Sequence, residues 1–243
     1  DVYKRQILVR SRGHLRAIIP ALKSAGLEWQ ANDIDPLATR MAVVDLISLT
    51  RALVSPTDRI AWLAVLRAPF CGLDLADLLQ ISDSGANSSS GQTIIVEQLM
   101  QRFDEPDKPF IGALSEHGRM VLARIVPVLK KAWTQRSRTD LRVAVEQCWV
   151  GLGGYATLKS PSEQRDVERF LDLLSTHQVA GHVPDWDALQ LAVEKLFASP
   201  SVANNRLDGL SGIQIMTIHK AKGLEFDQVL LPGLSHATPA NDK

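Results

Sequence analysis

Cysteine is scarce in this chain of 243 residues, which contains only Cys71 and Cys148. The two thiols lie far apart in the sequence and in no metal-binding or redox spacing. This excludes a disulfide framework and predicts a protein of the reducing cytoplasm. The six histidines are scattered along the chain, so the sequence predicts no metal site.

Long apolar segments and an excess of charge of either sign are also absent. No apolar run reaches the length of a membrane span and no signal-peptide pattern occurs, so we expect no membrane partner. The 27 basic and 27 acidic residues balance, so nucleic acid would have to bind to local basic patches. Hydrophobic residues at 45% and charged residues at 22% are globular values and exclude bulk disorder.

Two catalytic motifs are missing as well. A phosphate-binding loop of the form G-x-x-x-x-G-K-S/T does not occur, and no acidic pair follows an apolar strand to hold magnesium. We therefore expect the chain alone not to hydrolyse ATP. Pro106-Asp107 and Pro184-Asp185 occur, but neither is followed by the E-x-K of a metal-dependent nuclease, so we predict no nuclease site in this segment.

The most informative stretch is residues 213–231, with the sequence IQIMTIHKAKGLEFDQVLL. Its first apolar run, residues 213–218, is typical of a buried strand, and Gly223 breaks the local structure before a second apolar run at 229–231. Hydroxyl, imidazole and ammonium groups come at the end of the first run: Thr217, His219, Lys220 and Lys222. The carboxyl ends of buried strands are where open α/β sheets bind ligands.

The residue types at this position indicate the class of ligand. Lysines close to a turn can bind phosphate through their charge together with free backbone N–H groups. Glu225 is the first acidic residue in this basic stretch, and a carboxylate there can accept hydrogen bonds from hydroxyl groups such as those of a ribose. The residues therefore predict a site for a nucleotide or a nucleic acid.

The same stretch closely resembles the fifth helicase motif of superfamily 1 DNA helicases of the UvrD/Rep/RecB type, T-x-H-x-x-K-G-L-E-F/W. Its fixed positions are filled by Thr217, His219, Lys222, Gly223, Leu224, Glu225 and Phe226. The alternative is an ordinary strand–turn–strand with a solvated lysine pair, but seven matches in register directly after an apolar strand argue against it. The resemblance implies that Lys222, Gly223 and Glu225 bind the nucleotide, and that Thr217 and His219 bind single-stranded DNA.

A second stretch, ILVRSRGHLRAIIPALKSAGLEWQ, lies near the start of the chain. It predicts a strand at residues 6–9, a helix ended by Gly26, and a short strand at residues 27–31. It resembles the strand and helix that begin the second RecA-like domain of these helicases. Arg10 and Ser11 fit that motif, whereas Arg12 stands where an amide is common in the UvrD branch. The resemblance implies that Arg10 and Arg12 lie along the DNA groove; the alternative is a helix merely capped by basic residues.

The middle of the chain reads as helices throughout. We expect them at residues 37–54, 57–69, 74–81, 93–102, 111–135, 139–150, 162–177 and 185–198, with a loop at 82–92 and a linker at 199–211. Short strands at the two ends of a chain cannot each form a sheet alone, so we predict that they join a single sheet.

The predicted fold class is therefore α/β with a mostly α insertion. With the resemblance, this becomes a partial RecA-like parallel sheet interrupted by a helical domain. Residues 1–34 and 211–243 would belong to the second RecA-like domain, and residues 35–210 would form the insertion. The chain begins without methionine and residues 1–6 resemble nothing in the family, so we expect a fragment of a longer protein.

The resemblance implies a parent that is an ATP-dependent DNA helicase using ATP and Mg²⁺. Its partners would be single-stranded and duplex DNA and an N-terminal RecA-like domain. The stretches DIDPLATRMAVVDLISLTRAL and WLAVLRAPFCGL look like the AddA/RecB branch, which would add a second subunit of a helicase–nuclease complex in double-strand-break repair. Two alternatives remain: a catalytically inactive helicase-like scaffold, and a helical protein-interaction module carried by the insertion. The retained polar residues of the fifth motif favour an active parent.

One basic patch stands out between residues 119 and 142. It comprises Arg119, Arg124, Lys130, Lys131, Arg136, Arg138 and Arg142, against a single acidic residue, Asp140. Basic helices can lie along a duplex backbone. The charge pattern favours the alternative, a solvated helix face.

Overall fold

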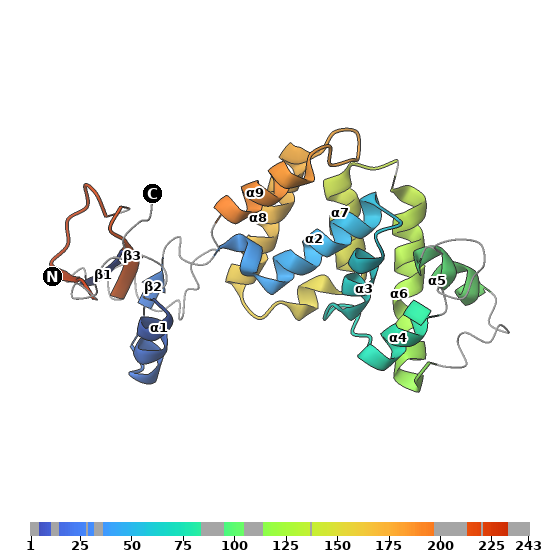
Figure 1. Ribbon diagram of the computed structural model, residues 1–243, viewed down its shortest axis with the longest axis horizontal. Helices are drawn as coiled ribbons and strands as arrows, with labels where there is room; N and C mark the ends of the chain where they lie inside the picture. Colours follow the sequence, from blue (N-terminus) through green and yellow to red (C-terminus); the bar gives the residue numbers. More distant parts are fainter. Residues whose placement is uncertain are drawn as a thin grey trace, which may run out of the picture. The chain divides into compact units, whose positions relative to one another are not determined.

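The computed structural model describes residues 5–10, 15–27, 29–31, 36–83, 95–104, 114–136, 138–196, 213–219 and 221–232. The chain divides into two compact units (Figure 1). One unit combines Asp1–Pro36 with Phe197–Lys243, and the other is Leu37–Leu196. Each unit has a hydrophobic core of its own. The fold is mostly helical, with a small parallel sheet.

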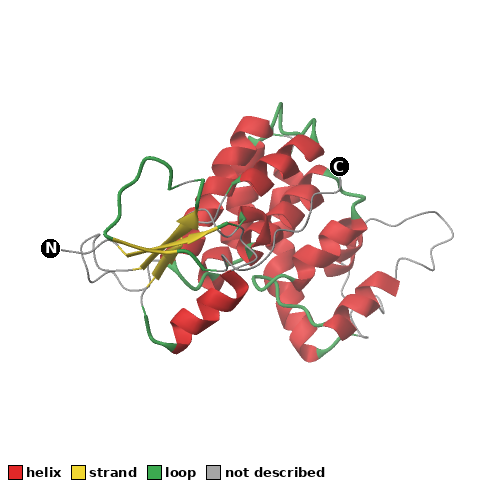
Figure 2. Ribbon diagram, turned by 60° about the vertical axis from the view of Figure 1, so that its left-hand side comes forward, coloured by secondary structure: helices red, strands yellow, loops and turns green. Residues whose placement is uncertain are grey.

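The first unit is built around a parallel sheet of four strands (Figure 2). They are β1 (Arg5–Val9), β2 (Trp29–Ala31), β3 (Ile213–Thr217) and β4 (Gln228–Leu230), in the order β2-β3-β1-β4. All three pairings are parallel. The strand that follows the long helical segment, β3, lies between β1 and β2. The prediction that the two ends of the chain join one sheet is confirmed.

Helix α1 (Leu15–Ser24) packs against this sheet. Side chains alternate between the two faces of a sheet along each strand. Ile7 and Val9 of β1 therefore point to the same face, and so does Ile215 of β3, which pairs with Ile7. The shared core comprises Ile7, Val9, Leu15, Leu22 and Ile215. Gly26 follows α1 with a φ of +64°, which L side chains rarely adopt, and ends the helix as the sequence predicts.

The second unit contains most of the helices. They are η2 (Leu37–Thr39), α2 (Met41–Val54), α3 (Arg59–Arg67), α4 (Leu75–Asp83), α5 (Ile95–Asp104), α6 (Glu116–Gln135), α7 (Leu141–Gly151), η4 (Gly154–Thr157), α8 (Pro161–His177) and α9 (Trp186–Lys195). The predicted helices match these closely. Helix α2 is central, because it packs against α3, α7 and α8.

Side-chain caps define where several of these helices begin. The carboxylates of Asp58, Asp140 and Asp185 each accept a hydrogen bond from a backbone N–H in the first turn of α3, α7 and α9. The hydroxyl groups of Ser115 and Ser160 do the same for α6 and α8. Such caps satisfy N–H groups that have no partner within the helix.

Most predicted helices differ from the observed ones by one to three residues at an end, and two differ by more. The helix expected at residues 37–54 is interrupted, because Arg40 has an extended backbone between η2 and α2. There the Nε of Arg40 donates to Oδ2 of the buried Asp166 on α8 at 3.0 Å. The helix expected from residue 111 begins at Glu116, since Ser115 is its cap. Residues 111–113 lie outside the described part.

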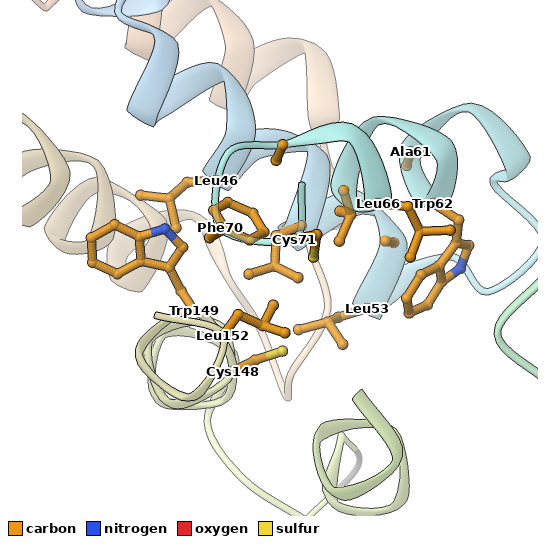
Figure 3. Packing of buried hydrophobic residues seen from close by; sticks show 14 of the residues in the cluster. Leu46, Leu53, Ala61, Trp62, Leu66, Phe70, Cys71, Cys148, Trp149 and Leu152 are labelled. Atoms are coloured by element: carbon orange, nitrogen blue, oxygen red, sulfur yellow. The ribbon is translucent and has the colours of Figure 1, made fainter. Parts of the chain in front are cut away.

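The core of the helical unit takes side chains from α2 to α9, and Figure 3 shows the part of it where α2, α3, α7 and the α3–α4 loop meet. Trp149 and Cys148 of α7 and Cys71 of the loop are at most 2% exposed. Both cysteines are free thiols. Burial raises the pKa of each thiol to about 12, so neither is activated as a nucleophile.

Candidate functional site

The ends of β1 and β3 form the sheet edge that carries the candidate site. Val9 of β1 is level with Thr217 of β3, and the N–H of Ile218 donates to the carbonyl oxygen of Val9 at 3.1 Å. The pairing therefore continues one residue past the registered strands. Because the strands are parallel, Arg10 and His219 leave the sheet at the same edge.

The side chains at this edge are accessible. Arg10 and His219 are exposed and Thr217 is half-buried. A guanidinium, an imidazole and a hydroxyl group can all donate hydrogen bonds to phosphate oxygens, and the guanidinium also neutralises phosphate charge. This combination of groups can bind the backbone of a nucleic acid.

Two successive turns follow β3. The N–H of Ala221 donates to the carbonyl oxygens of Thr217 and Ile218 at 3.2 Å each, and the N–H of Leu224 donates to the carbonyl oxygen of Ala221 at 3.1 Å. Gly223 is the third residue of the second turn and has a φ of +84°, as a type II turn requires. Apart from its chain neighbours, no atom of the described residues lies within 4 Å of the position that a Cβ would take at this glycine, so its positive φ and not a lack of space is the reason for glycine here.

The segment after β3 leads from the carboxyl end of β1 to its amino end. It begins beside Val9 and reaches β4 at Gln228, which is level with Arg5 at the other end of the strand. Strands β3 and β4 flank β1, so this segment connects the two neighbours of β1. Lys222 and Glu225 lie exposed on it. A ligand could therefore reach both side chains.

The structure thus brings some of the predicted site residues together. Arg10, Thr217 and His219 lie at one sheet edge, while Lys222, Gly223 and Glu225 lie in the segment that leaves that edge. Arg12 and Lys220 lie outside the described residues.

The described residues contain neither a metal-binding cluster nor a membrane helix. Among them, no three His, Cys, Asp or Glu side chains come together in a group that could hold a metal ion. None of the helices in the described part of the chain is both long and apolar enough to cross a membrane.

Much of the basic patch has internal partners. Arg124 donates to the carbonyl oxygens of Phe70, Cys71 and Leu152 and so fixes the α3–α4 loop to the end of α7. Lys130 pairs with Asp104, and Arg142 pairs with Glu146 and Asp172. The guanidinium of Arg136 lies 3.7 Å from the ring centroid of Trp133. These contacts use several of the charges to hold the helical unit together.

A groove between α2 and α9 has no counterpart in the sequence patterns. The α9 stripe of Trp186, Leu189 and Val193 indicates an apolar helix face, but the pattern does not say whether that face is fully covered. Only the three-dimensional arrangement of the two helices opens a groove there.

Comparison with known proteins agrees with the motif at the sheet edge. A family model described as the UvrD-like helicase C-terminal domain matches residues 1–240. A probable DNA helicase II homolog of Rickettsia conorii is 22% identical over 229 residues, which cover 93% of this chain and 33% of the relative. DNA helicase II of Escherichia coli is 22% identical over 233 residues, covering 94% of this chain and 31% of the relative.

A third relative has a longer chain. An ATP-dependent helicase/nuclease subunit of Lactococcus lactis is 24% identical over 242 residues, covering 94% of this chain and 19% of the relative. The chain thus spans about a third of the length of the helicase II relatives and less of this one. Because the family model matches nearly every residue, the chain belongs to the family of UvrD-like helicase C-terminal domains.

Proposed function

We propose that this chain is part of an ATP-dependent DNA helicase or translocase of the UvrD/RecB group. Residues 1–34 and 211–243 form part of the second RecA-like domain, and residues 35–210 form its helical insertion. The division into a sheet unit and a helical unit supports this assignment, as do the helicase names of the relatives.

The observation that carries the proposal is the pairing of β1 with β3. It brings Arg10, Thr217 and His219 to one accessible sheet edge, where they bind a single strand of DNA. Arg10 neutralises a phosphate, and Thr217 donates a hydrogen bond to the strand. His219 binds phosphate or stacks on a base, and stacking of a base on an aromatic ring contributes roughly 1–3 kcal/mol. From the resemblance of its stretch to the family motif, Arg12 is also expected to bind the strand.

The segment after β3 supplies this chain's share of the ATP site. Lys222 and the turn at Gly223 bind phosphate, and Glu225 accepts hydrogen bonds from the ribose hydroxyls. The exposure of Lys222 and Glu225 fits this role, because a nucleotide can approach both. In the full-length protein, hydrolysis of ATP bound with Mg²⁺ would supply the free energy for movement along the DNA strand. Since the chain has no phosphate-binding loop motif, an N-terminal RecA-like domain would supply the contacts to Mg²⁺ and the γ-phosphate.

A narrower form of the proposal is a helicase–nuclease subunit in DNA repair, working with a second subunit. The name of the Lactococcus relative supports it, since that protein is a helicase/nuclease subunit. DNA-stimulated ATP turnover by the full-length protein distinguishes the motor from a catalytically inactive scaffold: turnover is expected, and its absence would favour the scaffold.

The test of the DNA site is the salt dependence of single-strand binding by the full-length protein. Each phosphate contact contributes about 0.7 to the slope of log affinity against log salt for a single strand. Arg10→Ala should therefore flatten the slope by about 0.7. Lys195→Ala removes an exposed cation of α9, outside the basic patch, and serves as the control, with no expected change. An unchanged slope in a folded Arg10→Ala variant would show that Arg10 does not contact a phosphate of the DNA.

A further inference from the structure

Ile218 is an apolar residue at a polar sheet edge. It lies between Thr217 and His219 where β3 ends, and 44% of its surface is exposed. Its backbone is held in place, because its N–H donates to the carbonyl oxygen of Val9 on β1 at 3.1 Å. A single exposed isoleucine is common on protein surfaces. This one lies among the side chains that we assign to DNA binding, so its neighbours determine what it contacts.

Arg10 and Ile218 are neighbours at this edge. Val9 and Thr217 form the last registered pair of β1 and β3, and Val9 belongs to the core that α1 covers. Successive side chains of a strand point to opposite faces of the sheet. Arg10 and Ile218 each come one residue later and therefore lie toward the face opposite α1. Adjacent strands are about 4.8 Å apart, so a guanidinium and an apolar side chain border the same small area.

The face opposite α1 is apolar up to this edge. Met216 of β3 is buried there, and Leu8, its partner on β1, is half-buried. Ile218 follows Met216 by two residues and is exposed. The apolar surface of this face thus becomes accessible at the position where the guanidinium of Arg10 begins.

A nucleotide carries two covalently linked groups that match these two side chains. One is its charged phosphate, and the other is the attached sugar, which has a methylene at C2′ in DNA and a hydroxyl group in RNA. A guanidinium binds phosphate through its charge and its N–H groups. The side chain of isoleucine can pack against a methylene, but it has no atom that donates or accepts a hydrogen bond.

We propose that Ile218 makes this site prefer DNA to RNA by packing against C2′ of the nucleotide whose phosphate Arg10 binds. The inference rests on the DNA site of the proposed function. Arg10 contributes affinity for either nucleic acid, since both carry the same phosphate. Ile218 contributes the discrimination, because a 2′-hydroxyl group against it loses water and gains no partner. One unmade hydrogen bond corresponds to about a fivefold loss of affinity.

The test compares two probes that differ only at C2′. They are fluorescein-labelled oligo(deoxyuridine) and oligo(uridine) of equal length, each titrated with the full-length protein without ATP and followed by fluorescence anisotropy. The wild type should bind the DNA probe about fivefold more tightly than the RNA probe. Ile218→Thr keeps the β-branched shape and adds a hydroxyl group. This variant should bind the RNA probe more tightly than the wild type does, which brings the ratio of the two affinities close to one.

Two further variants serve as controls. Ile218→Val keeps an apolar side chain and should keep the preference for DNA. Leu27 is 48% exposed in the same unit and precedes β2, so it lies at the opposite end of the parallel sheet. Leu27→Thr therefore makes a similar chemical change away from the site and should leave the ratio unchanged.

Arg10→Ala distinguishes a failure of this inference from a failure of the DNA site. It should weaken both probes by the same factor and leave their ratio as in the wild type. If Arg10→Ala weakens both probes but the wild type binds them equally, or Ile218→Thr does not change the ratio, the role of Ile218 is refuted. The same holds if Leu27→Thr changes the ratio as much as Ile218→Thr. If Arg10→Ala affects neither probe, the DNA site itself is wrong and the role of Ile218 is refuted with it.

Discussion

The N–H of Ile218 donates to the carbonyl oxygen of Val9 at 3.1 Å, although the whole helical unit separates these residues in the sequence. This bond extends the ladder of β1 and β3 beyond the pair of Val9 and Thr217. The segments on either side of the helical unit are therefore joined directly, and the spacing of Arg10 and His219 depends on this ladder.

Glu225→Gln tests the proposed ribose contact in the full-length protein. The substitution keeps the shape of the side chain and removes its charge, so hydrogen bonds from ribose hydroxyls should weaken. We expect a KM for ATP raised by about tenfold, with single-strand affinity unchanged. ATPase kinetics and DNA titrations measure the two quantities. A loss of DNA affinity at constant KM would instead assign Glu225 to the DNA site.

Gly118→Ala should destabilise the chain although alanine favours helices. A Cβ at this position would lie 2.2 Å from Oδ2 of Asp77. That carboxylate is buried and accepts from the N–H of Ser115 at 2.8 Å and from its hydroxyl group at 2.6 Å, so it cannot move freely. We expect a loss of about 2 kcal/mol in the free energy of unfolding, measured in urea.

A double-mutant cycle checks the cause of that loss. Asp77→Ala alone should also destabilise the chain, because Ser115 loses both hydrogen bonds. Once Asp77 is alanine, adding Gly118→Ala should cost little, since the clashing oxygen is gone. Strictly additive losses, or a stabilising Gly118→Ala, would contradict the contact.

Arg40→Ala should be strongly destabilising because it removes the ion pair that the guanidinium makes with a buried carboxylate. The side chain of Asp166 is 1% exposed, whereas that of Arg40 is 27% exposed. Removing one member of a buried pair typically costs about 3 kcal/mol. Lys130→Ala breaks the exposed pair with Asp104 and should cost less than about 1 kcal/mol. If urea unfolding gave both variants the same loss in the free energy of unfolding, the difference between the buried and the exposed ion pair would be contradicted.

Asp45 should make stability depend on pH. It is half-buried on α2, and burial raises the pKa of its carboxyl from 3.8 to about 6. The folded state therefore holds this proton more tightly than the unfolded chain does. Its contribution is fully present below the unfolded pKa and is lost as the pH rises through about 6.

Asp45→Asn removes this dependence because the amide does not ionise. We expect the variant to be more stable than the wild type by about 1 kcal/mol near neutral pH, a value reduced for partial solvent access, and nearly equal to it around pH 4. Urea unfolding at both pH values measures the difference. Glu194→Gln on the exposed face of α9 is the control and should show no such gain. A gain that is the same at both pH values would have another cause.

The sequence determined the local structure of this chain. Apolar residues at helical spacing predict the helices, and the predicted ranges 57–69 and 185–198 begin at or next to Asp58 and Asp185, which cap the observed helices. Gly26 and Gly223 have a positive φ in turns that are closed by hydrogen bonds between residues close in the sequence. The fifth-motif residues identified the family without coordinates. Each of these features involves residues close together in the chain, so it can be recognised in a single sequence.

The tertiary structure decided which distant residues meet. The order of strands, with β3 between β1 and β2, could not be read from four short apolar runs. The break at Arg40 follows from Asp166 on another helix, and Arg124 is held by backbone carbonyls of two separate segments. The groove beside Trp186 exists because α9 packs on α8 and η2. Such features depend on register and packing between residues far apart in the chain, and local sequence patterns do not specify them.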